Sequence, residues 1–281
     1  MPTLLSVNVN KVATLRNQRD GDVPSVLGMA KLAMDAGAHG ITVHPRPDAR
    51  HIRASDCDDL AAAFAAPEKG VGSLFLGGDA ANTGGDDRKR LPTPFSFRGE
   101  FNIEGNPLDF GGGHLMPILR RIRPTQATLV PDDPGQNTSD HGWDVVKHRE
   151  TLKPIVAELK ALGCRVSLFL DPDPELAKRA ADTGCDRIEL YTEGFAKAFA
   201  QGGDALKRSL DAFAATAQAA RAAGLGVNAG HDLNLENLPA FLAAVPCVDE
   251  VSIGHALVAD ALVMGMSAAV AAYVDICQSA G

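Results

Sequence analysis

The sequence lacks long apolar runs, and no segment approaches the roughly 18 consecutive apolar residues of a membrane-spanning helix. It also lacks a long basic run, the longest being Arg88-Lys89-Arg90. The 27 basic residues against 35 acidic ones give a net charge of −8, which argues against nucleic acid and anionic membranes as partners. The five cysteines are widely spaced and never form a CxxC pair, which indicates reduced thiols in a cytoplasmic protein.

The remaining composition is that of a globular protein, with 45% hydrophobic and 22% charged residues. A length of 281 residues lies near the upper limit for one hydrophobic core, about 250 to 300 residues, and barrel folds commonly fill it as one domain. We therefore expect a single α/β domain that covers residues 1–281.

Eight short β-branched runs alternate with eight longer Ala/Leu-rich stretches, which is typical of βα units around a parallel sheet. The expected strands cover residues 4–9, 40–44, 100–104, 127–131, 165–170, 187–191, 226–229 and 250–253. The expected helices cover residues 23–36, 55–66, 110–122, 143–162, 174–183, 203–223, 235–244 and 256–278. This count predicts a (β/α)₈ TIM barrel with an extra helical segment in the first loop. A doubly wound sheet is the alternative, but its glycine-rich first turn is missing.

An insertion at about residues 67–99 interrupts the alternation, because it is rich in glycine and has neither helical nor strand periodicity. It connects a helix to the next strand, and such loops lie on the N-terminal face of a barrel, opposite the usual active site. We expect it to serve in packing or subunit contact, or to be a solvated loop.

Polar residues follow the predicted strand ends, where a barrel carries its catalytic groups. Histidines occur at four of these positions and are suited to proton transfer near neutral pH. Glu104 and Glu189 lie on otherwise apolar strands, so burial is expected to raise their pKa and make them plausible bases. A structural salt bridge of Glu189 with Lys11 or Arg46 is the alternative. The strand-end residues are Asn8, Asn10, Lys11, His44, Arg46, Arg50, His51, Glu104, Asp132, Asp133, Asp171, Glu189, Thr192, His231, Asp232 and His255.

Two short Gly-His turns, Gly230-His231 and Gly254-His255, follow the last two strands, where barrels often bind phosphate through backbone N–H groups and a helix N-terminus. Guanidinium groups for another anion are available from Arg16, Arg19, Arg46 and Arg50, although Arg16 could instead only tether the first loop. The HxH and HExxH patterns and Cys/His clusters typical of metal sites are missing, so nothing in the sequence suggests zinc.

The segments that carry these residues resemble the pyridoxine 5′-phosphate synthase family over nearly the whole chain outside the insertion. They are SVNVNKVATLRNQR, GAHGITVHPRPDARHIR, FNIEGN, TLVPDD, RIELYT, NAGHDL and SIGHAL, in this order. The resemblance implies a TIM barrel without cofactor or metal. It further implies condensation of 3-amino-2-oxopropyl phosphate with 1-deoxy-D-xylulose 5-phosphate to give pyridoxine 5′-phosphate, inorganic phosphate and water.

The resemblance also assigns roles to individual residues. It implies acid–base roles for His44, Glu104 and His231, with Glu189 as an assisting carboxylate. Contacts to the aminoketone phosphate are implied for Asn8, Arg19, Gly254 and His255, and contacts to the deoxyxylulose phosphate for Arg46, His51 and Thr138.

Three substrate-site positions, Asn10, Lys11 and Asp232, depart from the best-known branch of the family, which has Asp-His at the first two and glycine at the third. Lys11 can replace histidine as a cationic phosphate contact, and Asp232 can orient either His231 or the substrate amine. The family's habit implies a homo-oligomer, an octamer built from dimers, and the apolar stretch 256–278 favours a subunit contact. We expect the loop 131–142 to act as a lid over the site.

Two functions from other classes stay open from the sequence. A metal-dependent barrel hydrolase or aldolase would use His44, Glu104, His231 and His255 as ligands, and a non-catalytic paralogue would only bind phosphorylated metabolites.

Overall fold

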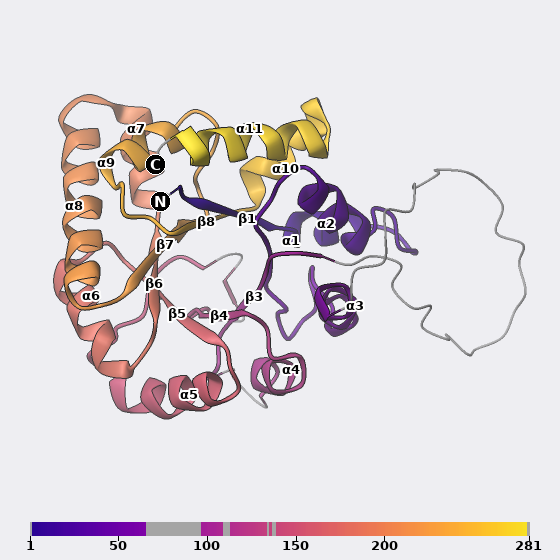
Figure 1. The fold of residues 1–281 in the computed structure, drawn as a ribbon, viewed down its shortest axis with the longest axis horizontal. Coiled ribbons are helices and arrows are strands. Elements are labelled where there is room, and N and C mark those ends of the chain that lie inside the picture. The colour runs from indigo at the N-terminus through magenta and orange to yellow at the C-terminus, as the bar shows by residue number, and fades with distance from the viewer. Residues whose placement is uncertain (1, 66–96, 109–112, 134, 137–138, 280–281) are drawn as a thin grey trace, which may run out of the picture.

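Eight parallel strands close into a barrel in chain order, which confirms the predicted (β/α)₈ architecture (Figure 1). The computed structural model describes residues 2–65, 97–108, 113–133, 135–136 and 139–279. Each strand begins and ends within two residues of its predicted bounds. The strands are β1 (Leu4–Asn8), β2 (Gly40–Val43), β3 (Glu100–Gly105), β4 (Gln126–Leu129), β5 (Arg165–Leu170), β6 (Arg187–Tyr191), β7 (Gly226–Gly230) and β8 (Glu250–Ile253).

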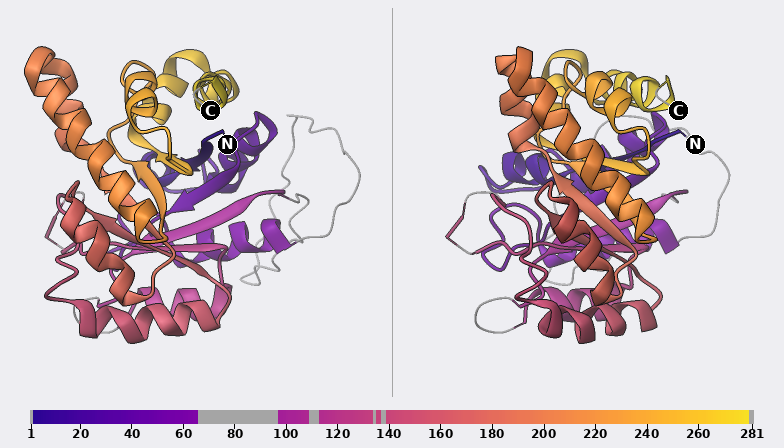
Figure 2. Two further views of the ribbon diagram at one scale, coloured as in Figure 1. Left: turned by 60° about the vertical axis from the view of Figure 1, so that its left-hand side comes forward. Right: turned by 90° about the vertical axis from the view of Figure 1, so that its left-hand side faces the viewer.

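The helices lie outside the ring of strands, as two further views show (Figure 2). Three helices go beyond a repeat of eight. Helix α1 lies in the first loop, where an extra helical segment was predicted, α7 follows β6 without having been predicted, and α10 and α11 take the place of one helix. The helices are α1 (Asn10–Arg16), α2 (Val26–Asp35), α3 (Ala54–Ala65), α4 (Leu115–Ile122), α5 (Arg149–Ala161), α6 (Pro174–Ala180), α7 (Glu193–Gln201), α8 (Gly203–Ala222), α9 (Leu238–Ala244), α10 (His255–Met264) and α11 (Met266–Ser279), with a 3₁₀ turn η1 (Ala181–Thr183).

The last predicted helix is wrong in one respect, because residues 256–278 form two helices instead of one. Gly265, at φ 82° and ψ 150°, separates α10 from α11, and this backbone conformation is one that glycine adopts without strain. The predicted helix 143–162 also begins too early, because the corresponding helix α5 begins at Arg149. The Trp143 amide donates to the Phe169 carbonyl at 2.8 Å and its ring N–H donates to the Leu129 carbonyl at 2.9 Å, so this residue is bound to the strand ends.

The hydrophobic core lies between the barrel and its helices, because side chains alternate along each strand. Leu5, Val7, Ile41 and Ile103 are completely buried on the outward face. The inward face is polar instead. Gln126 on β4 donates to Glu250 on the opposite strand β8 at 3.3 Å, a contact that has to cross the barrel interior.

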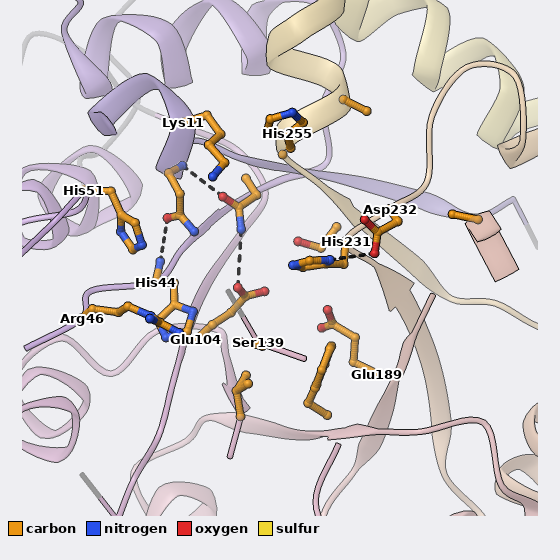
Figure 3. A pocket seen from close by; sticks show the side chains of 18 of the residues that line it. Lys11, His44, Arg46, His51, Glu104, Ser139, Glu189, His231, Asp232 and His255 are labelled. Carbon is orange, nitrogen blue, oxygen red and sulfur yellow. Dashed lines mark hydrogen bonds and ion pairs between the residues drawn. The ribbon is translucent and has the colours of Figure 1, made fainter. Parts of the chain in front are cut away.

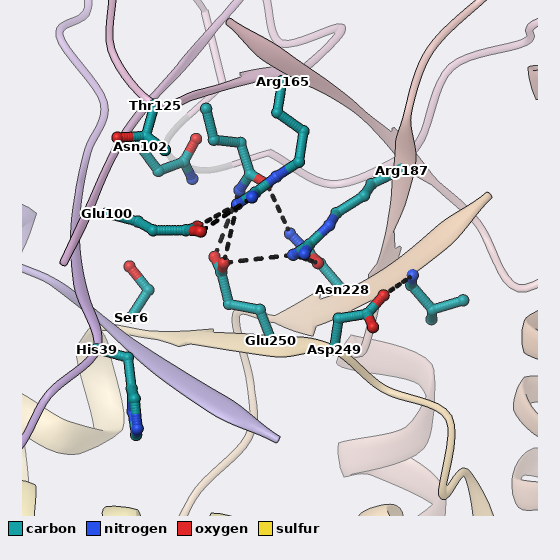
Figure 4. Close-up of polar contacts among 12 residues, drawn as sticks. Ser6, His39, Glu100, Asn102, Thr125, Arg165, Arg187, Asn228, Asp249 and Glu250 are labelled. Atoms are coloured by element: carbon teal, nitrogen blue, oxygen red, sulfur yellow. Dashed lines mark hydrogen bonds and ion pairs between the residues drawn. The ribbon is translucent and has the colours of Figure 1, made fainter. Parts of the chain in front are cut away.

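Charged groups close the N-terminal end of the barrel (Figure 4). Arg165 forms an ion pair with Glu100 and lies 3.6 Å from Glu250, while Arg187 lies 3.5 Å from the same Glu250 carboxylate oxygen. Burial and the neighbouring Glu100 charge raise the pKa of Glu250 to about 7. These charged side chains neutralise one another and fill the N-terminal end of the barrel. The barrel is therefore open at its C-terminal end.

Most of the insertion, residues 67–96, lies outside the described residues, and its predicted role stays a prediction. Among the residues that the structure describes, no helix combines the length and apolar character needed to cross a bilayer.

Candidate active site

A cavity of about 530 Å³ opens at the C-terminal ends of the strands, where the catalytic groups were predicted to gather. Of the fourteen residues proposed from the sequence, twelve line this cavity, Arg19 does not, and Thr138 is outside the described residues. Its lining consists of Asn8, Asn10, Lys11, His44, Arg46, His51, Glu104, Val130, Ser139, Phe169, Glu189, Ala196, His231, Asp232, Asn234, Ser252, Gly254, His255 and Ala256.

Two asparagines at the end of β1 connect the first strand to the proposed acid–base groups. The Asn8 side-chain oxygen accepts from the Asn10 amide at 3.0 Å, and the Asn10 side-chain oxygen accepts from the His44 amide at 2.9 Å. The Asn8 amide group also donates to Oε2 of Glu104 at 3.4 Å. Asn8 and Asn10 therefore fix the backbone of His44 and the carboxylate of Glu104 relative to one another.

Two buried carboxyl groups face the cavity from β3 and β6 (Figure 3). Burial, reinforced by the charge of Glu189, raises the pKa of Glu104 well above its usual value. Burial and the charge of Glu250 raise the pKa of Glu189 to about 8. Among the described residues, Oε2 of Glu189 has no hydrogen-bond partner, and the alternative of a salt bridge to Lys11 or Arg46 is not realised. Both groups therefore hold a proton more firmly than an exposed carboxyl group does.

His231 and Asp232 form a hydrogen-bonded pair at the end of β7. Nδ1 of His231 lies 2.8 Å from Oδ2 of Asp232, and Figure 3 shows the imidazole on the same side of the cavity as Glu189. His231 has φ 73°, an uncommon backbone angle for a residue with a side chain. The turn is held by the Thr192 hydroxyl, which accepts from the Asp232 amide at 3.3 Å, and by Asn237, whose side chain donates to the Asp232 carbonyl at 3.1 Å. Of the two roles predicted for Asp232, this geometry favours orienting His231.

Positive groups gather on the opposite side of the cavity, around His51. Burial, followed by the charges of His44, Arg46 and Lys11, lowers the pKa of His51 to about 3, so its imidazole is neutral at physiological pH. Nδ1 of His51 accepts from the Ile52 amide at 2.9 Å, so Nε2 carries the proton of the neutral ring. His51 is thus a neutral hydrogen-bond donor beside the cations.

The N-terminus of α10 borders the cavity at Gly254, His255 and Ala256. Backbone N–H groups in a first helical turn have no partner within the helix, and no side chain caps this end. A Cβ at Gly254 would lie only 3.0 Å from Cβ of Asn8, so glycine permits the close approach of β8 and β1. Figure 3 shows Lys11 and His255 on the same side of the cavity, next to this helix end. Such an arrangement suits a phosphate group.

Arg19 and Arg16 lie outside the cavity. Arg19 is exposed and lines a separate hollow formed by residues 17–22 and Arg53, so its predicted substrate contact stays a prediction. Arg16 is buried in an ion pair with Asp56 and donates to the His51 carbonyl at 3.2 Å, which is the tethering role considered from the sequence. Thr138 lies outside the described residues, as do two other positions of the proposed lid.

Sequence reasoning named Asp132 as a strand-end residue but did not place it among the site residues. The structure buries its side chain against His44 and Arg46. Sequence reasoning also missed the apolar wall formed by Val130, Phe169 and Tyr191 at the ends of β4, β5 and β6. A hydrophobic side chain at a strand end looks like core in the sequence, so no pattern distinguishes this wall.

Solved structures with the same architecture belong to several enzymes. A thiamine phosphate pyrophosphorylase from Pyrococcus furiosus matches with a TM-score of 0.53 at 12% identity, covering 99% of this chain and 96% of that one. A Mycobacterium tuberculosis tryptophan synthase structure matches with a TM-score of 0.56 at 13% identity, covering 99% and 93%. These similarities establish the fold alone: the chain is a (β/α)₈ barrel, with acid–base side chains gathered at the face that carries the active site in barrel enzymes.

Sequence similarity defines the family. The chain matches the family described as "Pyridoxal phosphate biosynthesis protein PdxJ" over residues 5–70 and 85–279. It is 50% identical to the pyridoxine 5′-phosphate synthase of Xanthomonas axonopodis pv. citri, with 99% of this chain and 98% of that protein covered. It is 47% identical to the protein of the same name from Brucella anthropi, with 98% of each covered. The chain belongs to the PdxJ family of pyridoxal phosphate biosynthesis proteins.

Proposed function

We propose that this chain is a pyridoxine 5′-phosphate synthase, which joins 3-amino-2-oxopropyl phosphate and 1-deoxy-D-xylulose 5-phosphate in vitamin B6 biosynthesis. The observation that carries the proposal is the convergence of His44, Glu104, Glu189 and His231 on one cavity, in a chain about half identical to proteins of that name. The products are pyridoxine 5′-phosphate, inorganic phosphate and water.

The reaction requires several proton transfers, because an amine condenses with a ketone, phosphate and water are eliminated, and a ring becomes aromatic. Without a cofactor, each transfer needs a positioned side chain. Glu104 and His44 act as bases and His231 as an acid. The raised pKa of Glu104 supports this role, because a carboxylate with a raised pKa is a stronger base than an exposed one. Glu189 assists as the second carboxyl group of the cavity.

Two phosphorylated substrates need two anion sites, and the cavity offers one at each side. The aminoketone phosphate binds at the uncapped N-terminus of α10, with Asn8, Gly254, His255 and Lys11 around it. The deoxyxylulose phosphate binds at the cationic side, where Arg46 and the neutral donor His51 lie. In this proposal the reacting carbons lie between the two sites, next to Glu104 and His231.

A direct assay tests the proposal. The purified protein is incubated with both substrates in buffer containing a chelator, and pyridoxine 5′-phosphate is detected by mass spectrometry. We expect product formation that depends on both substrates and continues with the chelator present. Absence of product with the folded protein would contradict the proposed function.

Elemental analysis separates this function from that of a metal-dependent hydrolase or aldolase. Within the described residues, no group of three His, Cys, Asp or Glu side chains is arranged to hold a metal ion. Bound metal in stoichiometric amount, lost together with activity on chelation, would favour the alternative. Binding of both phosphorylated substrates without turnover would instead indicate a non-catalytic paralogue.

The proposal includes a cytoplasmic location and assembly into an octamer built from dimers. Exposed apolar side chains at the end of α10 support a subunit contact, since Leu262 and Val263 are 76% and 88% exposed. Light scattering tests the assembly, and a monomer at micromolar concentration would contradict it.

A further inference from the structure

Asp132, directly after β4, lies between two of the proposed site residues. Its Oδ2 is 3.3 Å from Nε2 of His44 and 2.8 Å from Nη2 of Arg46. The Asp132 side chain is 7% exposed, and its carbonyl accepts from the Asn106 side chain at 2.9 Å. Both the backbone and the carboxylate of Asp132 are therefore fixed.

Asp132 contacts His44 on the side that faces away from the main cavity. His44 and Arg46 line both the main cavity and a smaller hollow of about 180 Å³, whereas Asp132 lines only the smaller one. Pro45, Pro47 and Asn106 form part of the same hollow. The wall between the two spaces is thus made by His44 and Arg46, and Asp132 supports this wall without facing the substrates.

The charge of Asp132 determines which nitrogen of His44 carries a proton. Burial opposes ionisation of Asp132, but the hydrogen bond from His44 and the charge of Arg46, at 2.8 Å, outweigh burial and lower its pKa. A carboxylate only accepts hydrogen bonds, so Nε2 of His44 has to be the donor. The neutral imidazole then has its lone pair on Nδ1.

We propose that Asp132 is the positioning residue that holds His44 in its Nε2–H form and leaves Nδ1 as the atom that takes a proton from the substrate. The proton passes from the substrate to Nδ1, which gives an imidazolium ion balanced by the Asp132 carboxylate, and it returns from Nδ1 in a later step. The same carboxylate holds Arg46 in place for its substrate anion. The inference rests on the proposed function for its kinetic part, whereas the protonation pattern of His44 can be measured independently.

Nitrogen NMR of the substrate-free protein with ¹⁵N-labelled histidine tests the first part. The signals of His44 are identified by their loss in His44→Gln. At a pH where the ring is neutral, we expect a protonated Nε2 and an unprotonated Nδ1. A protonated Nδ1 in the unaltered protein would overturn the inference, whatever the enzyme's activity and whether or not any Asp132 variant folds.

Asp132→Asn tests the second part, because it keeps the shape but an amide can also donate to Nε2. We expect the Nδ1–H form of His44 to appear and kcat to fall about tenfold or more. The KM for the deoxyxylulose phosphate should rise, since Arg46 loses its counter-charge, while the KM for the aminoketone phosphate stays within about twofold.

Asp211→Asn is the matched control, because Asp211 is exposed on α8, pairs with Lys207 and lies outside the site. It should leave the His44 signals and both KM values unchanged. Unchanged kcat and His44 signals in Asp132→Asn would overturn the inference. A parent protein that makes no product would contradict the proposed function alone, because the NMR result for His44 would still decide the role of Asp132.

Discussion

Replacing Glu189 with glutamine tests whether this carboxyl group is protonated near neutral pH. Its pKa rises from an ordinary 4.5 to about 8 in the folded chain, because burial and the charge of Glu250 disfavour the ionised form. Between these two pH values the folded chain retains a proton that the unfolded chain has lost. The stability of the parent protein therefore falls as pH rises through this window, and Glu189→Gln does not share that loss.

The size of the effect follows from the difference between the pKa of Glu189 in the folded chain and in the unfolded chain. At 1.36 kcal/mol for each pH unit, the raised pKa of Glu189 lowers the free energy of unfolding of the parent by roughly 2 kcal/mol at pH 6. At pH 9, above both pKa values, the loss is on the order of 5 kcal/mol. Any change in packing or hydrogen bonding caused by the substitution is the same at both pH values. We therefore expect Glu189→Gln to gain about 2 to 3 kcal/mol relative to the parent between pH 6 and pH 9.

Urea unfolding at fixed protein concentration measures this gain, and the buried Trp143, the single tryptophan of the chain, provides the fluorescence signal. The control is Glu158→Gln, because the side-chain hydrogen bond from Arg120 lowers the pKa of Glu158 and keeps it ionised throughout this range. Its stability relative to the parent should not change between the two pH values. A difference between Glu189→Gln and the parent that is equal at pH 6 and pH 9 would refute the reasoning.

Three further substitutions test the site by steady-state kinetics. Glu104→Gln keeps the shape but removes a base, so turnover should fall about a hundredfold or more with KM largely unchanged. Asp232→Asn removes the charge beside the imidazole of His231 at 2.8 Å, and kcat should fall roughly tenfold to a hundredfold. Gly254→Ala introduces a Cβ 3.0 Å from Asn8, so the KM for the aminoketone phosphate should rise on the order of tenfold.

Each of these expectations has an outcome that contradicts it. Near-normal turnover of Glu104→Gln would exclude that residue as a base. An unaltered kcat in Asp232→Asn would mean that the hydrogen bond to His231 has no role in catalysis. Gly194→Ala is the control for Gly254→Ala, because a Cβ at Gly194 meets no atom within 4 Å. If the two alanine variants have the same KM, crowding at Gly254 is not limiting.

The sequence alone determined the architecture, because barrel strands and helices repeat in a local pattern. Apolar β-branched runs and glycines at helix ends are short-range features, and eight such units fit one closed fold. The same pattern placed His44, Glu104, Glu189 and His231 at strand ends, and the structure brings them to one cavity. The local pattern did not predict that the last helix is broken at Gly265, because the apolar stretch continues on both sides of this glycine.

Only the tertiary structure decided how the strand-end side chains pair. The pKa of Glu104 depends on Glu189, which is distant in sequence and comes close only when the barrel closes. The contact of Asp132 with His44 and Arg46 likewise joins separate loops. Burial and charge act through space and fall off with distance, not with separation along the chain, so the pKa values and hydrogen-bond partners of the site follow from the closed barrel.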